Sequence, residues 1–312
     1  MAEFALRPLS LGELLDRSFT IFRRRFGAII LIMIACLLIP SLMFLNNIRG
    51  FMVMAQQMQP GGSPQEQMQV MFAMFGTIFK IAAVFALGML IARTALGWIA
   101  HKAMLGEDTD VMTALTHGVK LFFPMLGLLL VEMAIIIVAE IVLYIPMIIF
   151  GVGAVGTAAA TKSAPGLGFG LGMLVMMIGY LIAILYVFAS LFVTTSTLVA
   201  EADTGVFKAV ERSWNLTKGR RGAIIGSMIL VYVLVWVVML AVSFTVGIGA
   251  GLAGAGAGAA GGMMLAVFGG MILFSLAVSG FYFVLQMVTY YDLRVRKEGL
   301  DLELASAAMT QA

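Results

Sequence analysis

Four charged residues lie inside long apolar runs of the sequence: Lys80, Arg93, Glu132 and Glu140. A charge in the hydrocarbon of a membrane is costly and often marks a proton or substrate path. The same residues also suit two ion pairs between neighbouring helices, with Lys80 and Glu140 at one depth and Arg93 and Glu132 at another. We favour structural pairing over a path, because each charge has an opposite charge nearby.

Two basic clusters precede apolar runs and suggest phosphate chemistry. They consist of Arg23, Arg24 and Arg25 and of Lys218, Arg220 and Arg221. Near an anionic leaflet, each Lys or Arg contributes about 1 kcal/mol of attraction, so the clusters are candidate sites for anionic lipids or phosphate. Basic residues also mark the cytoplasmic loops of membrane proteins, and we favour this simpler interpretation.

The sequence offers little for enzymatic chemistry. It lacks H-E-x-x-H, G-x-S-x-G and P-loop motifs. The glycine-rich segments 151–156 and 249–254 match a dinucleotide-binding pattern, but neither follows a strand of a βαβ unit. His101 and His117 share a link with acidic residues, for which a solvated link is a simpler interpretation than a metal site. We therefore predict no catalytic residue, no metal and no cofactor.

The composition identifies the environment of these residues. Of the 312 residues, 62% are hydrophobic and 11% are charged, and the mean hydropathy is +1.07. A soluble domain is about 45–50% apolar and about 25% charged. The chain is therefore expected to be an integral membrane protein whose main partner is the lipid bilayer, and we expect no nucleic-acid partner.

Six apolar runs are long enough to position the charges within a membrane. Each can cross a hydrocarbon core of about 30 Å as a helix, so the predicted fold is all-α with six transmembrane helices. The runs are 26–45, 70–99, 121–145, 171–196, 222–246 and 263–291. The segments on one side of this arrangement hold 16 of the 19 lysines and arginines, which predicts that both termini are cytoplasmic.

The chain also contains an internal repeat. Positions 15–34 and 210–229 share nine identical residues in twenty, and Arg17-Ser18 returns as Arg212-Ser213. We expect these two pairs to be equivalent docking positions. Gly127 and Met133 fall in register with the same pattern and indicate a weaker third copy.

We predict a single membrane domain of three parallel units, in which each unit is an interfacial helix followed by two spans. The units cover about 9–100, 108–196 and 204–291, and a cytoplasmic tail covers 292–312. A loose three-fold bundle is the corresponding hypothesis. Each unit begins with an amphipathic stretch that suits the membrane surface, and Ser10 with Glu13 predicts a capping box for the first.

The segments expected between spans on the outer side differ in composition. Segment 47–69 is rich in Gln and Met and contains two prolines, which is typical of a polar turn. Segments 147–170 and 247–262 are rich in Gly and Ala and suit either flexible loops or the small-residue ends of packed helices.

Three motifs at the cytoplasmic edges resemble a known family. They are Leu6-Arg7-Pro8-Leu9-Ser10-Leu11-Gly12-Glu13-Leu14-Leu15-Asp16, residues 211–219 (ERSWNLTKG) and the tail 290–303 (YYDLRVRKEGLDLE). Together they resemble the membrane domain of bacterial glycerophosphoryl diester phosphodiesterases. The resemblance implies a multi-pass protein of the bacterial inner membrane. It supplies no catalytic residue, because such a phosphodiesterase has its chemistry in a separate soluble barrel of about 250 residues.

The sequence leaves two functions open. We favour a non-enzymatic scaffold or accessory protein that binds lipid and has a membrane protein partner. The alternative is a transporter or channel with Lys80, Glu132 and Glu140 along a polar path. A path requires a wet cavity with unpaired carboxylates, whereas a scaffold requires a closed core in which the charges are paired.

Overall fold

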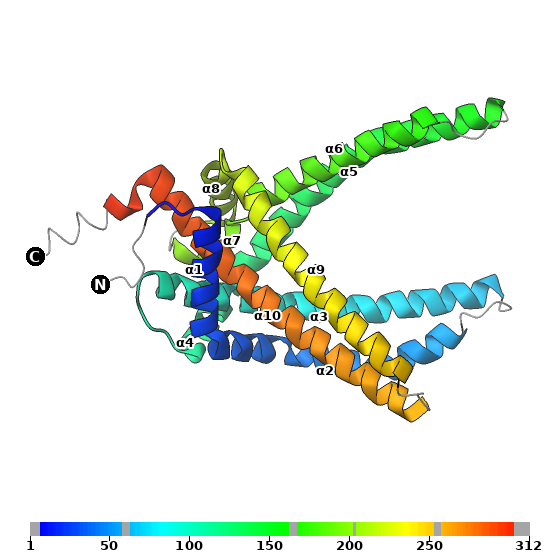
Figure 1. Ribbon diagram of the computed structural model, residues 1–312, viewed down its shortest axis with the longest axis horizontal. Helices are drawn as coiled ribbons and strands as arrows, with labels where there is room; N and C mark the ends of the chain where they lie inside the picture. Colours follow the sequence, from blue (N-terminus) through cyan, green and yellow to red (C-terminus); the bar gives the residue numbers. More distant parts are fainter. Residues whose placement is uncertain (1–6, 58–62, 162–166, 202–203, 253–256, 303–312) are drawn as a thin grey trace, which may run out of the picture.

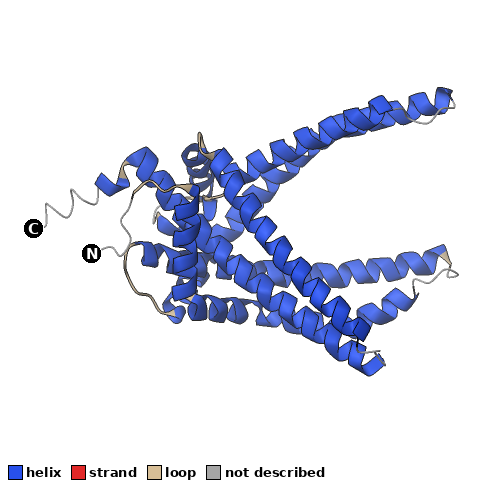
Figure 2. Ribbon diagram, in the orientation of Figure 1, coloured by secondary structure: helices blue, strands red, loops and turns tan. Residues whose placement is uncertain are grey.

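The structure is a computed structural model that describes residues 7–57, 63–161, 167–201, 204–252 and 257–302. Within these ranges the regular structure is helical and no strand occurs (Figure 2). The described helices are α1 (Leu11–Arg24), α2 (Phe26–Gln57), α3 (Pro64–Met104), α4 (Val111–Lys120), α5 (Phe122–Thr161), α6 (Leu167–Ser190), α7 (Thr194–Ala200), α8 (Val206–Thr217), α9 (Arg221–Leu252) and α10 (Ala257–Glu298).

The short helices gather at one end of the molecule. Helices α1, α4, α7 and α8 lie there together with the C-terminal part of α10 (Figure 1). We call this part of the molecule the short-helix end and the opposite part, where the long helices turn back, the hairpin end. A short helix leads directly into a long helix at α1–α2, α4–α5 and α8–α9.

Five of the described helical segments are long and apolar enough to cross a membrane. They are Phe26–Asn47, Gln65–Met104, Phe122–Gly156, Leu167–Ala200 and Arg221–Ala241. Their large apolar side chains face outward, as Phe72, Val142 and Leu181 show with exposed fractions of 64%, 61% and 54%. Such surfaces are compatible with a hydrocarbon environment. The sixth predicted run, 263–291, lies in α10, where many side chains fall outside the described residues.

The described parts of segment 47–69 are largely helical, so the predicted polar turn was too long, and residues 58–62, which include Pro60, lie outside the described residues. Helix α2 continues to Gln57 and α3 starts at Pro64. The start of α3 has a physical cause in the sequence. The Ser63 hydroxyl accepts the Glu66 N–H, the Glu66 carboxylate accepts the Ser63 N–H, and proline occupies the first turn. The described parts of the two Gly/Ala-rich segments are also helical.

The buried core lies at the short-helix end and continues between α2 and α3. These two helices approach closely at Gly88, where an added Cβ would lie only 2.3 Å from the carbonyl oxygen of Cys36. Toward the hairpin end, the α5–α6 hairpin diverges from the α2–α3 hairpin (Figure 1). The residues that connect the two hairpins are therefore concentrated at the short-helix end.

Each short helix that precedes a long one turns small residues inward. The buried positions include Ser18 in α1, Ala114 and Gly118 in α4, and Ala209 and Ser213 in α8. The outward faces hold large apolar side chains, with exposed fractions of 54% for Phe19, 70% for Met112 and 78% for Phe207. The capping box of Ser10 and Glu13 is confirmed at the start of α1.

Candidate functional site: paired charges at the short-helix end

Arg93 and Glu132 form a buried ion pair between α3 and α5. The two guanidinium Nη atoms donate to the two carboxylate oxygens at 3.1 and 3.3 Å, and the side chains are 18% and 11% exposed. The Thr194 hydroxyl of α7 also donates to Glu132. This expected pair is thus formed, and it joins three helices through the two oxygens of one carboxylate.

Thr194 reaches Glu132 because the chain bends between α6 and α7. Helix α6 ends at Ser190, and residues 191–193 form a turn before α7. The Ser213 hydroxyl of α8 donates to the Ser190 carbonyl at 2.8 Å, which satisfies a carbonyl near the end of α6. Two nearby polar atoms, Arg93 Nε and Thr195 Oγ1, are buried without a hydrogen-bond partner among the described residues.

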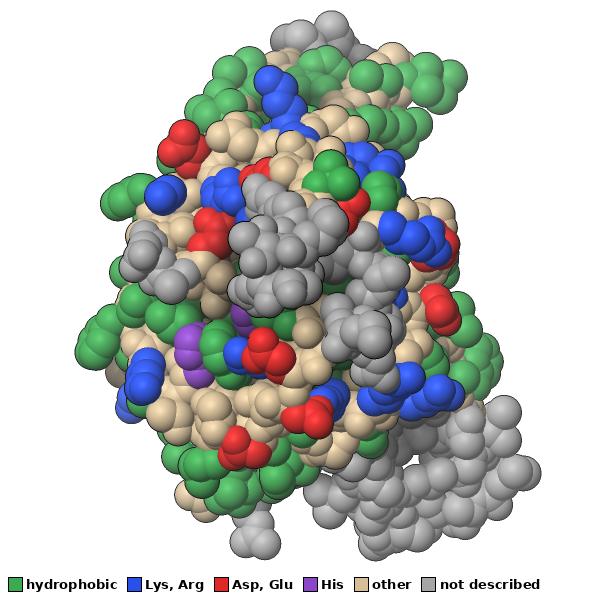
Figure 3. Space-filling model, turned by 90° about the vertical axis from the view of Figure 1, so that its left-hand side faces the viewer, with side chains coloured by type: hydrophobic (Ala, Val, Ile, Leu, Met, Phe, Trp, Pro, Cys, Tyr) green, Lys and Arg blue, Asp and Glu red, His purple; other side chains and the backbone are tan. Residues whose placement is uncertain are grey.

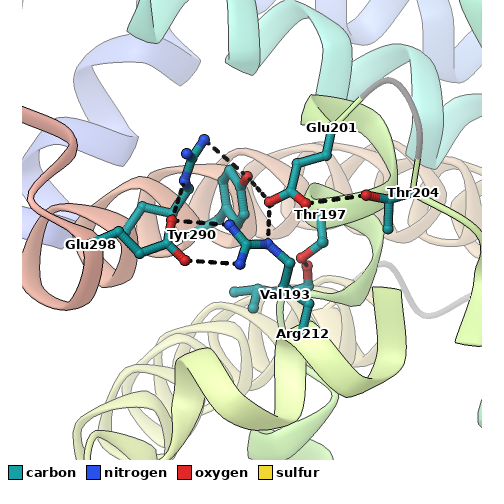
Figure 4. Close-up of polar contacts among 8 residues, drawn as sticks. Val193, Thr197, Glu201, Thr204, Arg212, Tyr290 and Glu298 are labelled. Carbon is teal, nitrogen blue, oxygen red and sulfur yellow. Dashed lines mark hydrogen bonds and ion pairs between the residues drawn. The ribbon is translucent and has the colours of Figure 1, made fainter. Parts of the chain in front are cut away.

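Arg212 joins α8 to the segment after α7 and to the end of α10 (Figure 4). Its guanidinium donates to Glu201 and contacts Glu298 at 2.8 and 2.9 Å. The Tyr290 hydroxyl donates to Glu201 at 2.8 Å, and Arg294 donates to Glu298 at 2.8 Å. Both carboxylates are therefore shared between donors from different positions on the chain.

The charges in this network stabilise one another. Burial opposes the charged form of Arg212, but the hydrogen bonds to Glu201 and Glu298 outweigh this effect and raise its pKa. Burial likewise opposes ionisation of Glu298, but the hydrogen bonds from Arg294 and Arg212 lower its pKa below the ordinary value of 4.5. Arg212 and Glu298 therefore each favour the charged form of the other.

The tail motif binds the segment that precedes α1. The Asp292 carboxylate, whose side chain is 2% exposed, accepts the Leu9 N–H at 2.7 Å and Arg296 Nε at 3.0 Å. Arg296 also donates to the Leu9 carbonyl at 2.5 Å. The two ends of the described chain are therefore held together at the short-helix end.

The predicted anionic-lipid residues differ in their exposure and in their contacts. Arg23, Arg24 and Lys218 are exposed. Arg25 pairs with Asp108.

Arg221, in contrast, is only 7% exposed. Its guanidinium lies over the rings of Tyr186 and Trp214 at 4.3 and 4.7 Å and donates to both residues. Arg220 is half-buried and lines a 20 Å³ cavity with Asp292. On the face of the short-helix end, basic and acidic side chains are intermixed (Figure 3).

The remaining predicted residues occupy separate places. Lys80 is exposed on α3. The Tyr180 hydroxyl of α6 donates to the Glu140 carboxylate and lies 2.7 and 2.9 Å from its two oxygens, whereas Lys80 does not bind this carboxylate. Ser18 is buried and donates to the Leu14 carbonyl one turn earlier, and Arg17 beside it is half-buried. In the described part of the chain, Lys80 and Glu140 therefore do not form the second expected ion pair.

His101 and His117 belong to an aromatic stack and not to an open solvated link. The rings of His101 and His117 stack on Trp98 with centroids 5.4 and 3.9 Å apart, and the Tyr291 hydroxyl lies 2.9 Å from His101 Nδ1. In the described ranges, no group of three or more His, Cys, Asp or Glu side chains has an arrangement suited to a metal ion.

Sequence reasoning missed Thr194, Glu201, Tyr180, Asp292 and Glu298 as partners. Asp292 and Glu298 fall in the recognised tail motif, so that motif was a usable signal. Thr194 gives no local signal, because it meets Glu132 only through the bend after α6. In the site as a whole, the buried carboxylates join helices to one another.

Comparison with known proteins gives a family but no named relative. No curated protein and no solved structure matches the chain. The family model described as Domain of unknown function (DUF7847) matches residues 9–293. This range includes α1, the Arg93–Glu132 pair, Arg212 and Asp292. Because the match covers most of its length, the chain belongs to the DUF7847 family.

Proposed function

We propose that the chain is a six-span scaffold or accessory protein of the bacterial inner membrane, with lipid as its principal ligand and without catalysis of its own. The Arg93–Glu132–Thr194 contact carries this proposal. It places a carboxylate that is 11% exposed between two donors from other helices, as expected of a group that fixes helix positions.

The position of Glu140 favours the scaffold over a transport path. A path needs its charged residues along one continuous polar route. Glu132 is bound at the short-helix end, whereas Glu140 lies on the diverging α5–α6 hairpin with Tyr180 and Lys80 is exposed on α3. These separate positions support a structural role for each charge.

We propose an architecture of three equivalent units, and the burial of threonines at matching positions supports it. The register that aligns Arg17-Ser18 with Arg212-Ser213 also aligns Thr94 of α3 with Thr289 of α10. Both threonines are at most 2% exposed, and each donates to the carbonyl four residues earlier. The second unit has Thr194 in the corresponding register, also buried.

Lipid binding is proposed at the outward faces of the short helices. Phe19, Met112 and Phe207 are exposed there, with Arg23, Arg24 and Lys218 also exposed at this end. Apolar and basic residues side by side suit the surface of an anionic leaflet. The docking of Leu9 to Asp292 supports placing both termini on the same side of the membrane, which we propose to be the cytoplasm.

The resemblance to the membrane domain of glycerophosphoryl diester phosphodiesterases remains part of the proposal, for fold and location only. Its tail motif contributes Asp292, Arg296 and Glu298, which bind neighbouring segments of the same chain. These contacts support a docking role for the motif.

The test compares wild type, Glu132→Gln and Glu140→Gln in sealed vesicles, with ion flux, thermal unfolding and co-purified lipid as readouts. We expect no flux that depends on either carboxylate, and a lower unfolding midpoint for Glu132→Gln. A wild-type flux that disappears in a folded variant would refute the scaffold and favour transport. Double replacement of Arg23 and Lys218 by Gln should reduce co-purified anionic lipid without lowering the midpoint.

A further inference from the structure

Two opposite charges at neighbouring depths have no counterion in the described chain. Lys80 is exposed on α3, and Glu140 is half-buried on α5, where Tyr180 supplies hydrogen bonds but no positive charge. Both lie between the bonded pair Arg93–Glu132 and the hairpin end. A membrane-embedded charge of this kind normally pairs with another charge or with backbone carbonyls.

The helical rise gives their approximate heights. Lys80 precedes Arg93 by 13 residues, and Glu140 follows Glu132 by eight, in helices that run in opposite directions. At about 1.5 Å per residue, the two lie roughly 20 and 12 Å above the Arg93–Glu132 pair. The difference of about 8 Å is about one and a half helical turns, which the long lysine side chain and helix tilt can accommodate.

Within one copy the two charges lie on different hairpins. The α5–α6 hairpin diverges from the α2–α3 hairpin (Figure 1), and Glu140 accepts its hydrogen bonds from within its own hairpin. Around both charges the surface is apolar and unpacked, with exposed fractions of 74% for Phe79, 55% for Ile141 and 54% for Leu181. Each hairpin therefore presents one charge within an apolar face.

We propose that this face binds a second copy of the chain, with the α5–α6 hairpin of one copy against the α2–α3 hairpin of the other and Glu140 facing Lys80. Charge complementarity identifies the partner, because each copy supplies the cation that Glu140 lacks and the anion that Lys80 lacks. The inference rests on the proposed membrane-spanning arrangement. It gives the scaffold a defined way to self-associate.

Cysteine cross-linking tests the contact directly, because Cys36 is the one cysteine of the sequence. In a Cys36→Ser chain, Lys80→Cys carries one tag and Glu140→Cys carries another, and the two are co-expressed and treated with a short thiol cross-linker. We expect a product that carries both tags. Ile149→Cys, an exposed position farther along α5, should give much less product with Lys80→Cys.

Charge reversal provides the second measurement. Lys80→Glu or Glu140→Lys alone should reduce co-purification of two differently tagged copies by roughly threefold to tenfold. The double variant Lys80→Glu/Glu140→Lys should restore it, which a folding defect would not allow.

The outcomes separate this inference from the proposed function. Absence of a two-tag product, while both cysteines stay protected from a membrane-impermeant thiol reagent, would overturn self-association and leave the six-span scaffold intact. A third protein has Lys80→Cys and Glu140→Cys in the same chain. If only this protein forms a cross-link, and the cross-link lies within one chain, self-association is overturned too, since the two hairpins of one copy would then contact each other. Cysteines open to the impermeant reagent would overturn the membrane arrangement and the inference together.

Discussion

Replacement of Asp292 by alanine should release the segment before α1 from α10. The Asp292 side chain is 2% exposed and accepts hydrogen bonds from Leu9 N–H and Arg296 Nε. Removal of one partner of a buried ion pair costs about 3–5 kcal/mol, because the other charge stays buried. Arg296 is 27% exposed, so water can replace part of the lost contact and we expect about 2–3 kcal/mol.

Hydrogen exchange at the Leu9 amide measures this release. A loss of 2–3 kcal/mol corresponds to roughly 30- to 150-fold faster exchange. Asp16→Ala provides the control, because Asp16 is an exposed carboxylate of α1 and its removal should leave Leu9 protected. Unchanged exchange at Leu9 in a folded Asp292→Ala protein would refute the docking role of the tail motif.

Three further predictions follow from close packing and from the hydrogen-bond networks. Gly88→Ala should destabilise the protein by about 1–3 kcal/mol, because the added Cβ would meet the Cys36 backbone at 2.3 Å, and thermal unfolding will show this. Ser213→Ala should cost about 1 kcal/mol while Ser18→Ala is nearly neutral, because Ser213 binds another helix and Ser18 binds its own turn. Below pH 4.5, falling pH should destabilise wild type more than Glu298→Gln, because the folded-state pKa of Glu298 is lowered.

Each of these predictions has a control variant or an outcome that would contradict it. Gly76→Ala, which has open space around the added Cβ, should leave the midpoint near that of wild type. Equal losses in the two serine variants would mean that the Ser190 carbonyl does not depend on Ser213. The stabilisation from ionised Glu298 is complete above its unfolded pKa and disappears as pH falls through its folded pKa. Parallel pH curves would therefore exclude its role.

The sequence predicted the helices well because the apolar runs are long. The run at 26–45 lies within α2 and the run at 222–246 lies within α9. The ends were harder to predict, since Gln- and Gly-rich stretches lack hydrophobic periodicity and yet continue as helix. The start of α3 could have been found, because Ser63, Pro64 and Glu66 form a recognisable capping pattern.

The candidate site was predictable only where partners face each other across adjacent helices. Arg93 and Glu132 lie on consecutive long helices, and their pairing is confirmed. The partner of Glu140 was not predictable, because the divergence of the α5–α6 hairpin is a tertiary property and leaves Tyr180 as its neighbour. Thr194 depends on the α6–α7 bend, for which residues 191–193 contain neither Gly nor Pro.

The most direct test of the account compares Arg93→Met, Glu132→Leu and the double variant by thermal unfolding in lipid nanodiscs. Each single variant leaves one buried charge without its partner and should lose about 3–5 kcal/mol, whereas the double variant removes both charges and should recover most of the loss. Recovery would establish that the pair serves to hold α3 against α5. A double variant as unstable as the sum of the singles would contradict this account.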